Sequence, residues 1–252
     1  MTVNNFTWNE LMSTDVQGSM DFYTALIGWK TQAQDMGTFT YNMLMASDKA
    51  VGGVVPFASS EEVPLPSHWV PYLEVKDVDA FTERAKTLGG EVCVPPTDIP
   101  GVGRFSLVQD PQGAIFSPMT SSSAAEAIGD TDPGPGQSCW IELMTNDVDG
   151  AKAFYSELVG WSFDTMDMGG TPYTLAKEGE RMVAGVMTPS EMFAGRPSWV
   201  TYTVVENIDG AAEKTVELGG KVAVPPVPLP SGGRMAIIID PTGGVLGLWA
   251  KA

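Results

Sequence analysis

Two glutamates occupy the same local sequence in the two halves of the chain and could carry acid–base or hydrogen-bonding chemistry. Glu10 lies in the segment WNELM, and Glu142 lies in the segment WIELM. A carboxylate within an otherwise apolar strand costs free energy unless it is paired or in contact with water. We therefore interpret both glutamates either as polar groups of a binding surface or as members of structural ion pairs, with Arg104 and Arg234 as candidate partners.

The single histidine, His68, has two interpretations. It could act as a metal ligand or as a general base together with Glu10, because an imidazole titrates near neutral pH. Alternatively, it is a hydrogen-bonded histidine where a strand begins, after the segment PLPS. Side chains alternate along a strand, so Tyr72 and Glu74 share its face. The second half lacks both this histidine and the second carboxylate, so if one half is active we expect it to be the first.

Aromatic residues on the same strands could form walls for a planar or apolar small molecule. These residues are Trp8, Tyr72, Trp140 and Tyr202. Aromatic side chains on half-buried strands also fill protein cores, and that alternative stays open. Trp69 and Trp199 have the opposite parity on their strands, so we expect them to pack against helices.

The elements that position these residues are duplicated along the chain. The first part of each half matches at an offset of 132 residues, which pairs Tyr41 with Tyr173, and later parts match at an offset of 130. Residues 123–137 are rich in Ser, Gly, Pro and Asp, which is typical of an exposed linker. We therefore predict two duplicated domains, 1–122 and 138–252, joined by this linker.

Each half contains the same order of predicted elements twice. A strand comes first, then a helix with apolar residues at helical spacing, and then several short strands separated by Gly and polar turns. In the first of these modules, Asp15 is predicted to cap the helix and Gly28 to end it. The pairs Phe22-Tyr23 and Phe154-Tyr155 are predicted core residues of such helices. The pattern indicates a βαβββ module that occurs four times.

These features resemble the vicinal oxygen chelate superfamily, which includes glyoxalase I, bleomycin-resistance proteins and extradiol dioxygenases. The motifs that carry the resemblance are the strand-Asp-helix-FYxxxxGW runs of residues 15–29 and 147–161, the helix starts at 75–79 and 205–209, and the Asp-Pro-x-Gly turns at Asp110 and Asp240. The resemblance covers nearly the whole chain. It implies an α+β fold of tandem glyoxalase-like domains, in each of which two paired βαβββ modules form an open, curved sheet that encloses a cup.

The resemblance also implies where a divalent metal would be bound, since members of this superfamily usually hold one in the cup through His, Gln or Glu. The corresponding positions are Trp8, Val70 and Ser117 in the first half and Trp140, Val200 and Gly247 in the second. Serine is a poor ligand, and the other five side chains offer no donor atom that suits a divalent metal. We therefore expect no metal cofactor, unless a non-standard site uses Glu10, His68 and Glu74.

The leading expectation for function is a cup that binds a small, partly aromatic or apolar molecule, as in sequestering proteins of the bleomycin-resistance type. The candidate binding residues are Trp8, Tyr72, Glu74, Arg104, Ser117, Trp140, Glu142, Tyr202 and Arg234, and the candidate catalytic residues are Glu10 and His68. One alternative is a glyoxalase-like lyase or an oxygenase with a shifted metal site. Another is a structural dimer module whose cups are vestigial.

Composition limits the other partners. The 252 residues include 14 basic and 31 acidic side chains, and the formal net charge of −17 opposes binding to nucleic acid or an anionic membrane. No run approaches the roughly 18 apolar residues of a membrane helix. The first residues show no secretory signal, and Cys93 and Cys139 form no metal-binding motif. We therefore expect a cytoplasmic protein, with a homodimer as one open assembly.

Overall fold

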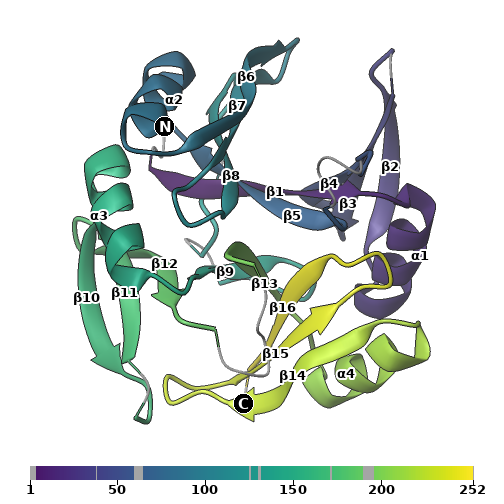
Figure 1. The fold of residues 1–252 in the computed structure, drawn as a ribbon. Helices are drawn as coiled ribbons and strands as arrows, with labels where there is room; N and C mark the ends of the chain where they lie inside the picture. The colour runs from purple at the N-terminus through teal and green to yellow at the C-terminus, as the bar shows by residue number, and fades with distance from the viewer. Residues whose placement is uncertain are drawn as a thin grey trace. The chain divides into compact units, whose positions relative to one another are not determined.

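The fold consists of four βαβββ modules in succession. The computed structural model describes residues 4–37, 39–59, 65–124, 126–129, 132–170, 172–189 and 196–251. Within these ranges the order strand, helix, three strands occurs four times (Figure 1). The predicted α+β class and the predicted module are both confirmed.

Among the described residues, each half of the chain contributes ten elements. In the first half they are β1 (Asn5–Ser13), α1 (Val16–Ile27), β2 (Lys30–Asp35), β3 (Thr40–Ala46), β4 (Lys49–Pro56), β5 (His68–Glu74), α2 (Val78–Thr87), β6 (Glu91–Ile99), β7 (Gly103–Gln109) and β8 (Ile115–Ser121). In the second half they are β9 (Ser138–Met144), α3 (Val148–Val159), β10 (Ser162–Asp167), β11 (Pro172–Glu178), β12 (Arg181–Met187), β13 (Ser198–Val204), α4 (Ile208–Glu217), β14 (Lys221–Pro228), β15 (Arg234–Ile239) and β16 (Val245–Ala250).

The strands form two open, curved sheets of eight strands each. The strand order is β2-β3-β4-β1-β5-β8-β7-β6 in the first sheet and β10-β11-β12-β9-β13-β16-β15-β14 in the second. In every module the first strand pairs in parallel with the last strand. The other neighbours within a module pair as antiparallel hairpins. These sheets are the ones that the tandem glyoxalase-like fold predicts.

The helices begin and end at the residues that the sequence indicated. The side chain of Asp15 accepts a hydrogen bond from the backbone N–H of Gly18, at 3.0 Å, and so satisfies a donor that the first helical turn leaves open. Gly28 ends α1 in the left-handed conformation, with φ of 83°. Equivalent caps begin the other three helices at Asp77, Asp147 and Asn207.

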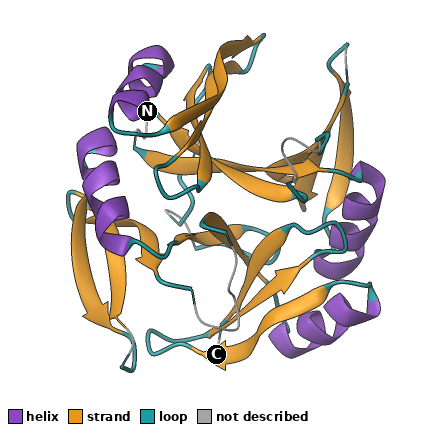
Figure 2. Cartoon of the chain, viewed as in Figure 1, coloured by secondary structure: helices purple, strands orange, loops and turns teal. Residues whose placement is uncertain are grey.

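Contacts divide the chain into two compact units, each built mainly from one module of each half. The first unit contains residues 1–8, 71–131 and 140–199, and therefore helices α2 and α3. The second unit contains residues 9–70, 132–139 and 200–252, and therefore helices α1 and α4. Within each unit the two helices lie side by side (Figure 2). These units differ from the two domains that the sequence repeat predicted, residues 1–122 and 138–252. Those domain boundaries stay a prediction.

A buried chain of hydrogen bonds crosses the core of the first unit. The indole N–H of Trp199 donates to the hydroxyl oxygen of Tyr155 at 3.1 Å. The Tyr155 hydroxyl donates in turn to the carboxylate of Asp110 at 3.0 Å. Phe154 and Tyr155 are both buried in this core, as helical spacing predicted.

The second unit repeats this arrangement with the corresponding residues. The indole N–H of Trp69 donates to the Tyr23 hydroxyl at 3.0 Å, and that hydroxyl donates to the carboxylate of Asp240 at 2.9 Å. Trp69 and Trp199 thus pack beside helix residues, which confirms the prediction from strand parity. Phe22 is likewise buried in the core.

Two described residues of the segment between the halves are buried. Ala127 is buried, and the carbonyl of Gly136 accepts a 2.7 Å hydrogen bond from the indole N–H of Trp29. The composition predicted exposure, and the other described residues of this segment are exposed or half-buried. The described helices have at most 12 residues, and none has the length and apolar character that crossing a bilayer requires.

Candidate functional site

Strand β9 presents two side chains to one face and packs the alternate residues into the core. Ile141 and Leu143 belong to the buried core of the first unit. Trp140 and Glu142 point to the opposite face, because side chains alternate along a strand. The predicted common face of this tryptophan and this glutamate is therefore confirmed.

A tyrosine that the sequence did not single out as a site residue completes this face. The indole N–H of Trp140 donates to the hydroxyl oxygen of Tyr173 at 2.9 Å. The Tyr173 hydroxyl is hydrogen-bonded to Glu142. Trp140, Tyr173 and Glu142 therefore form one polar and aromatic group on strands β9 and β11, which we call the Trp-Tyr-Glu face.

A glycine makes room for the Tyr173 hydroxyl. Gly185 on β12 pairs in register with Glu142. A Cβ atom at Gly185 would collide with the phenol oxygen of Tyr173 and would lie 3.1 Å from Oε1 of Glu142. Because Gly185 has no side chain, the Tyr173 phenol can lie over its backbone, next to the carboxyl group of Glu142.

The environment fixes the direction of the hydrogen bond between the two groups. Burial and the nearby negative charge of Glu142 raise the pKa of the Tyr173 phenol well above its ordinary value of 10.0. The phenol therefore stays protonated and donates a hydrogen bond to Glu142. The group can offer a ligand aromatic surface together with a carboxylate held in a fixed place.

The second unit carries the matching residues on β1, β3 and β4. Glu10 is 9% exposed and pairs in register with Gly53. A Cβ atom at Gly53 would collide with the phenol oxygen of Tyr41. Glu10, Tyr41 and Gly53 thus correspond to Glu142, Tyr173 and Gly185. The repeat had already paired Tyr41 with Tyr173, and strand glycines opposite the two glutamates were the signal that could have placed them in the site.

His68 has the contacts of a hydrogen-bonded histidine where a strand begins. Its Nδ1 lies 2.9 Å from the carbonyl oxygen of Pro66, and its ring meets that of Phe57 edge-on at 5.1 Å. These contacts fit the second interpretation of the sequence. A general-base role together with Glu10 stays a prediction.

Glu74 stabilises the end of a neighbouring strand. It is 4% exposed, and its two carboxylate oxygens accept hydrogen bonds from the Ser121 backbone N–H at 2.9 Å and from the Ser121 hydroxyl at 2.7 Å. Both bonds engage the last residue of β8. These two hydrogen bonds offset the cost of burying the Glu74 carboxyl group, so its burial requires no bound ligand.

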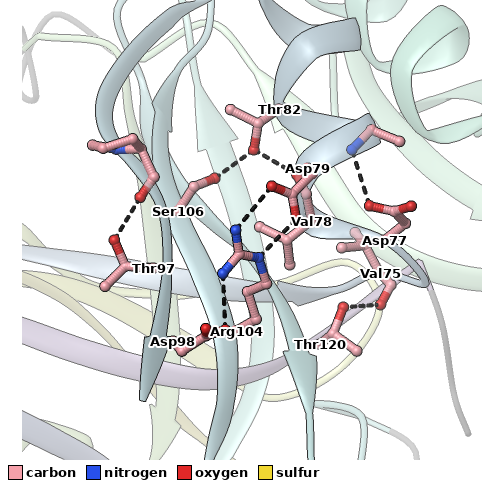
Figure 3. Close-up of polar contacts among 12 residues, drawn as sticks. Val75, Asp77, Val78, Asp79, Thr82, Thr97, Asp98, Arg104, Ser106 and Thr120 are labelled. Atoms are coloured by element: carbon pink, nitrogen blue, oxygen red, sulfur yellow. Dashed lines mark hydrogen bonds and ion pairs between the residues drawn. The ribbon is translucent and has the colours of Figure 1, made fainter.

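The two arginines pair with other carboxylates than the sequence suggested. Arg104 donates through Nε and Nη2 to both oxygens of Asp79, at 2.7 and 2.9 Å, and through Nη1 to Asp98 at 2.8 Å (Figure 3). Arg234 makes the corresponding pair with Asp209. The proposed pairing with Glu10 and Glu142 was wrong, because an aspartate in the first turn of the preceding helix of the same module lies beside each guanidinium. Ligand binding by either arginine stays a prediction.

The remaining candidates lie on the last strands of their modules or beside them. Tyr72 pairs in register with Ser117, and its ring stacks on Phe105 with ring centres 6.3 Å apart. The Ser117 hydroxyl donates to the carbonyl of Ser106 at 2.8 Å. In the second unit, the ring of Tyr202 covers Gly247 so closely that a Cβ there would collide with it. Ligand contacts of these residues stay predictions.

Comparisons with known proteins agree with this geometry. The family model described as Glyoxalase/Bleomycin resistance protein/Dioxygenase superfamily matches residues 5–117 and 139–247. The chain belongs to this superfamily. It is 32% identical over 251 residues to "Putative glyoxylase CFP32" of Mycobacterium bovis, covering 97% of this chain and 94% of that one. It is 33% identical over 250 residues to "Anthracycline biosynthesis protein DnrV" of Streptomyces peucetius, covering 94% and 89%.

Solved structures share the superfamily fold. The Mn(II)-bound glyoxalase from Novosphingobium aromaticivorans has a TM-score of 0.65 at 15% identity, covering 98% of this chain and 82% of that one. The 2,2',3-trihydroxybiphenyl 1,2-dioxygenase of Sphingomonas wittichii strain RW1 has a TM-score of 0.66 at 12% identity, covering 99% and 91%. At these identities the likeness concerns the fold.

The residues at the superfamily's usual metal positions do not suit a divalent metal. Val70 and Val200 are fully buried, the Ser117 hydroxyl is bonded to a backbone carbonyl, and the ring of Tyr202 covers Gly247. Among the residues that the structure describes, no three His, Cys, Asp or Glu side chains gather in a way that could hold a metal ion. We derive no chemistry through a metal at these positions.

Proposed function

We propose that this protein binds a small, partly aromatic or apolar molecule at the Trp-Tyr-Glu face and at the matching face of Tyr41 and Glu10. The observation that carries the proposal is the hydrogen-bonded series from Trp140 through Tyr173 to Glu142. It places two aromatic rings and one carboxylate on the same side of the sheet, opposite the packed core. Binding sites for small molecules typically combine such apolar walls with a few fixed polar groups.

The expected roles of the side chains follow from their chemistry. The rings of Trp140 and Tyr173 would stack on a planar ligand. The carboxylate of Glu142 can accept a hydrogen bond from the ligand in addition to the one from Tyr173, because a carboxylate has about four acceptor positions. Tyr173 fixes the orientation of the carboxylate before the ligand arrives.

The name of one relative supports an aromatic ligand. That relative, from Streptomyces peucetius, is named an anthracycline biosynthesis protein, and anthracyclines are planar polycyclic molecules. A ring system of this kind suits a face on which tryptophan and tyrosine side chains are hydrogen-bonded to each other. We extend this ligand class to the present chain as part of the proposal.

A glyoxalase-like lyase or an oxygenase is the alternative function, and the name "Putative glyoxylase CFP32" favours it. It would need a shifted metal site with Glu10, His68 and Glu74. Elemental analysis of the purified protein, with titration of Ni, Zn, Fe(II) and Mn, tests this. Stoichiometric metal that is lost in His68→Ala would favour the enzyme. A structural dimer module with vestigial cups, a homodimer and a cytoplasmic location are further predictions.

Calorimetric titration with 1-naphthalenemethanol tests the binding proposal. We expect saturable binding of two molecules per chain, one at each face, and loss of one of them in Trp140→Leu. Phe81→Leu is the control, because Phe81 lies on α2 and packs against the core of the first unit. No saturable binding, or unchanged binding by Trp140→Leu, would contradict the proposal.

A further inference from the structure

We infer that the ligand of these faces is a cation, in which a protonated amino group accompanies the aromatic or apolar part. The inference rests on the proposed function and adds the charge of the ligand to it. Its starting point is the position of the two glutamates relative to the aromatic rings. The rest of the charge distribution points in the same direction.

The Trp-Tyr-Glu face has a carboxyl group at its centre. Glu142 is 3% exposed and is hydrogen-bonded to the Tyr173 hydroxyl. In its ionised form this glutamate disfavours a second negative charge next to it, as its effect on the pKa of the Tyr173 phenol illustrates. An anionic ligand group would meet the same repulsion, whereas an ammonium group would be attracted.

The rings of Trp140 and Tyr173 add a second attraction for a cation. The face of an aromatic ring is negative relative to its edge, and tryptophan and tyrosine bind ammonium groups within about 6 Å of the ring centre. The Trp140 indole and the Tyr173 phenol are linked to each other at 2.9 Å. A carboxylate beside linked rings is the combination that suits an amine on an apolar frame.

The arginines that could have attracted an anion are already engaged. Arg104 in the first unit is in contact with two carboxylates, those of Asp79 and Asp98. Arg234 in the second unit is paired with Asp209. One guanidinium against two carboxylates leaves a local excess of negative charge. Both guanidinium groups that could attract an anionic ligand are therefore already paired with carboxylates.

The whole molecule strengthens this preference at long range. Its formal net charge of −17 attracts cations and repels anions in solution. This long-range contribution is screened by salt, whereas the contact with a buried carboxylate is screened much less. Salt dependence therefore separates the two contributions.

A series of three naphthalene probes tests the inference on the full chain. The probes are 1-naphthylmethylammonium, 1-naphthalenemethanol and 1-naphthoate, which share one ring system and differ in charge. Calorimetry at about 0.02 M and about 0.5 M salt compares their affinities. We expect the ammonium probe to bind about tenfold more tightly than the alcohol, with the carboxylate probe weakest, and we expect a preference to persist at high salt.

Matched variants locate the preference. In the double variant Glu10→Gln and Glu142→Gln, the ammonium probe should bind no more tightly than the alcohol. The control is the double variant Glu83→Gln and Glu213→Gln, which removes the same charge from exposed positions on α2 and α4. It should keep the preference. Because the probe series is first measured on the wild type, the inference stays testable even if the Glu10 and Glu142 variant does not fold.

The outcomes separate the inference from the proposed function. If the alcohol binds as tightly as the ammonium probe, or the carboxylate binds more tightly, the inference is wrong and the binding face stands. If the control variant loses the preference as fully as the Glu10 and Glu142 variant, the faces do not select the charge and the inference is also wrong. If none of the probes binds at about 1 mM, the proposed function itself is contradicted and the inference with it.

Discussion

The hydroxyl of Tyr155 donates a hydrogen bond to Oδ2 of Asp110 at 3.0 Å. Tyr155 belongs to a helix of the second half, and Asp110 begins the Asp-Pro turn of the first half. The other carboxylate oxygen, Oδ1, accepts the backbone N–H groups of Gln112, Gly113 and Ala114. Two motifs that indicated the superfamily, the Phe-Tyr pair of the helix and the Asp-Pro turn, are therefore in contact. They come from different halves of the chain and lie in the same compact unit.

Replacement of Tyr155 by phenylalanine should destabilise the fold by about 1 to 3 kcal/mol, because the indole N–H of Trp199 and the carboxylate of Asp110 would each lose a buried partner. Urea unfolding measures the change. In a double-mutant cycle with Asp110→Asn, the two losses should add up to more than the loss in the double variant. Strict additivity would show that the hydroxyl and the carboxylate act independently.

The stability that Asp110 contributes should fall as the pH rises. Burial raises the pKa of this carboxyl above its ordinary value of 3.8, although its hydrogen bonds act in the opposite direction. The folded chain therefore holds the proton at pH values where the unfolded chain has released it. The contribution is complete below the unfolded pKa and is lost as the pH rises through the folded one. Urea unfolding across this window should show the wild type losing stability relative to Asp110→Asn.

Asp79 provides a control of opposite sign. Hydrogen bonding to Arg104 lowers the pKa of the Asp79 carboxyl below its ordinary value of 3.8. Its contribution is present above the unfolded pKa and is lost as the pH falls through the folded one. The wild type should therefore gain stability relative to Asp79→Asn as the pH rises. The same sign for both variants would contradict this account of the two carboxyl groups.

Gly185→Ala should displace the Tyr173 phenol, because the added Cβ would collide with its oxygen. We expect a loss of about 1 to 3 kcal/mol in stability and weaker binding of 1-naphthalenemethanol. Gly134→Ala is a matched control, since a Cβ there meets nothing closer than 3.7 Å. Unchanged binding in Gly185→Ala would show that Tyr173 does not organise the face.

Glu74→Gln should lower stability and leave ligand binding unchanged. The substitution weakens the two hydrogen bonds that Glu74 accepts from Ser121, because an ionised acceptor forms stronger bonds than an amide. Thermal unfolding and the calorimetric titration measure the two effects. A variant that folds normally but binds the probe more weakly would contradict this prediction and would indicate that Glu74 contacts the ligand.

The sequence predicted the modules because their signals are local. A cap such as Asp15, a stop such as Gly28 and the alternation around Glu142 act within a few residues and require little tertiary information. The internal repeat showed the same signals in both halves of the chain, which supported each prediction a second time. The order of strands in the sheets followed from the resemblance that these motifs carried.

The partners of the charged residues could not be predicted in the same way. Arg104 lies 25 residues from Asp79 in the chain, and only the folded module brings them to 2.7 Å. Tyr173 became a site residue because Gly185, on another strand, leaves room for its hydroxyl. Both relationships depend on the register of paired strands or on helix packing, which a single sequence does not display.

Nuclear magnetic resonance of the tryptophan indole N–H groups tests the central claim most directly. The chain has seven tryptophans, and their signals can be followed while 1-naphthalenemethanol is added. We predict a saturable shift of the Trp140 signal, whose N–H is bonded to Tyr173, and little change for Trp69 and Trp199, which are bonded to core tyrosines. Saturable binding that leaves the Trp140 signal in place would contradict the assignment of this face as the binding site.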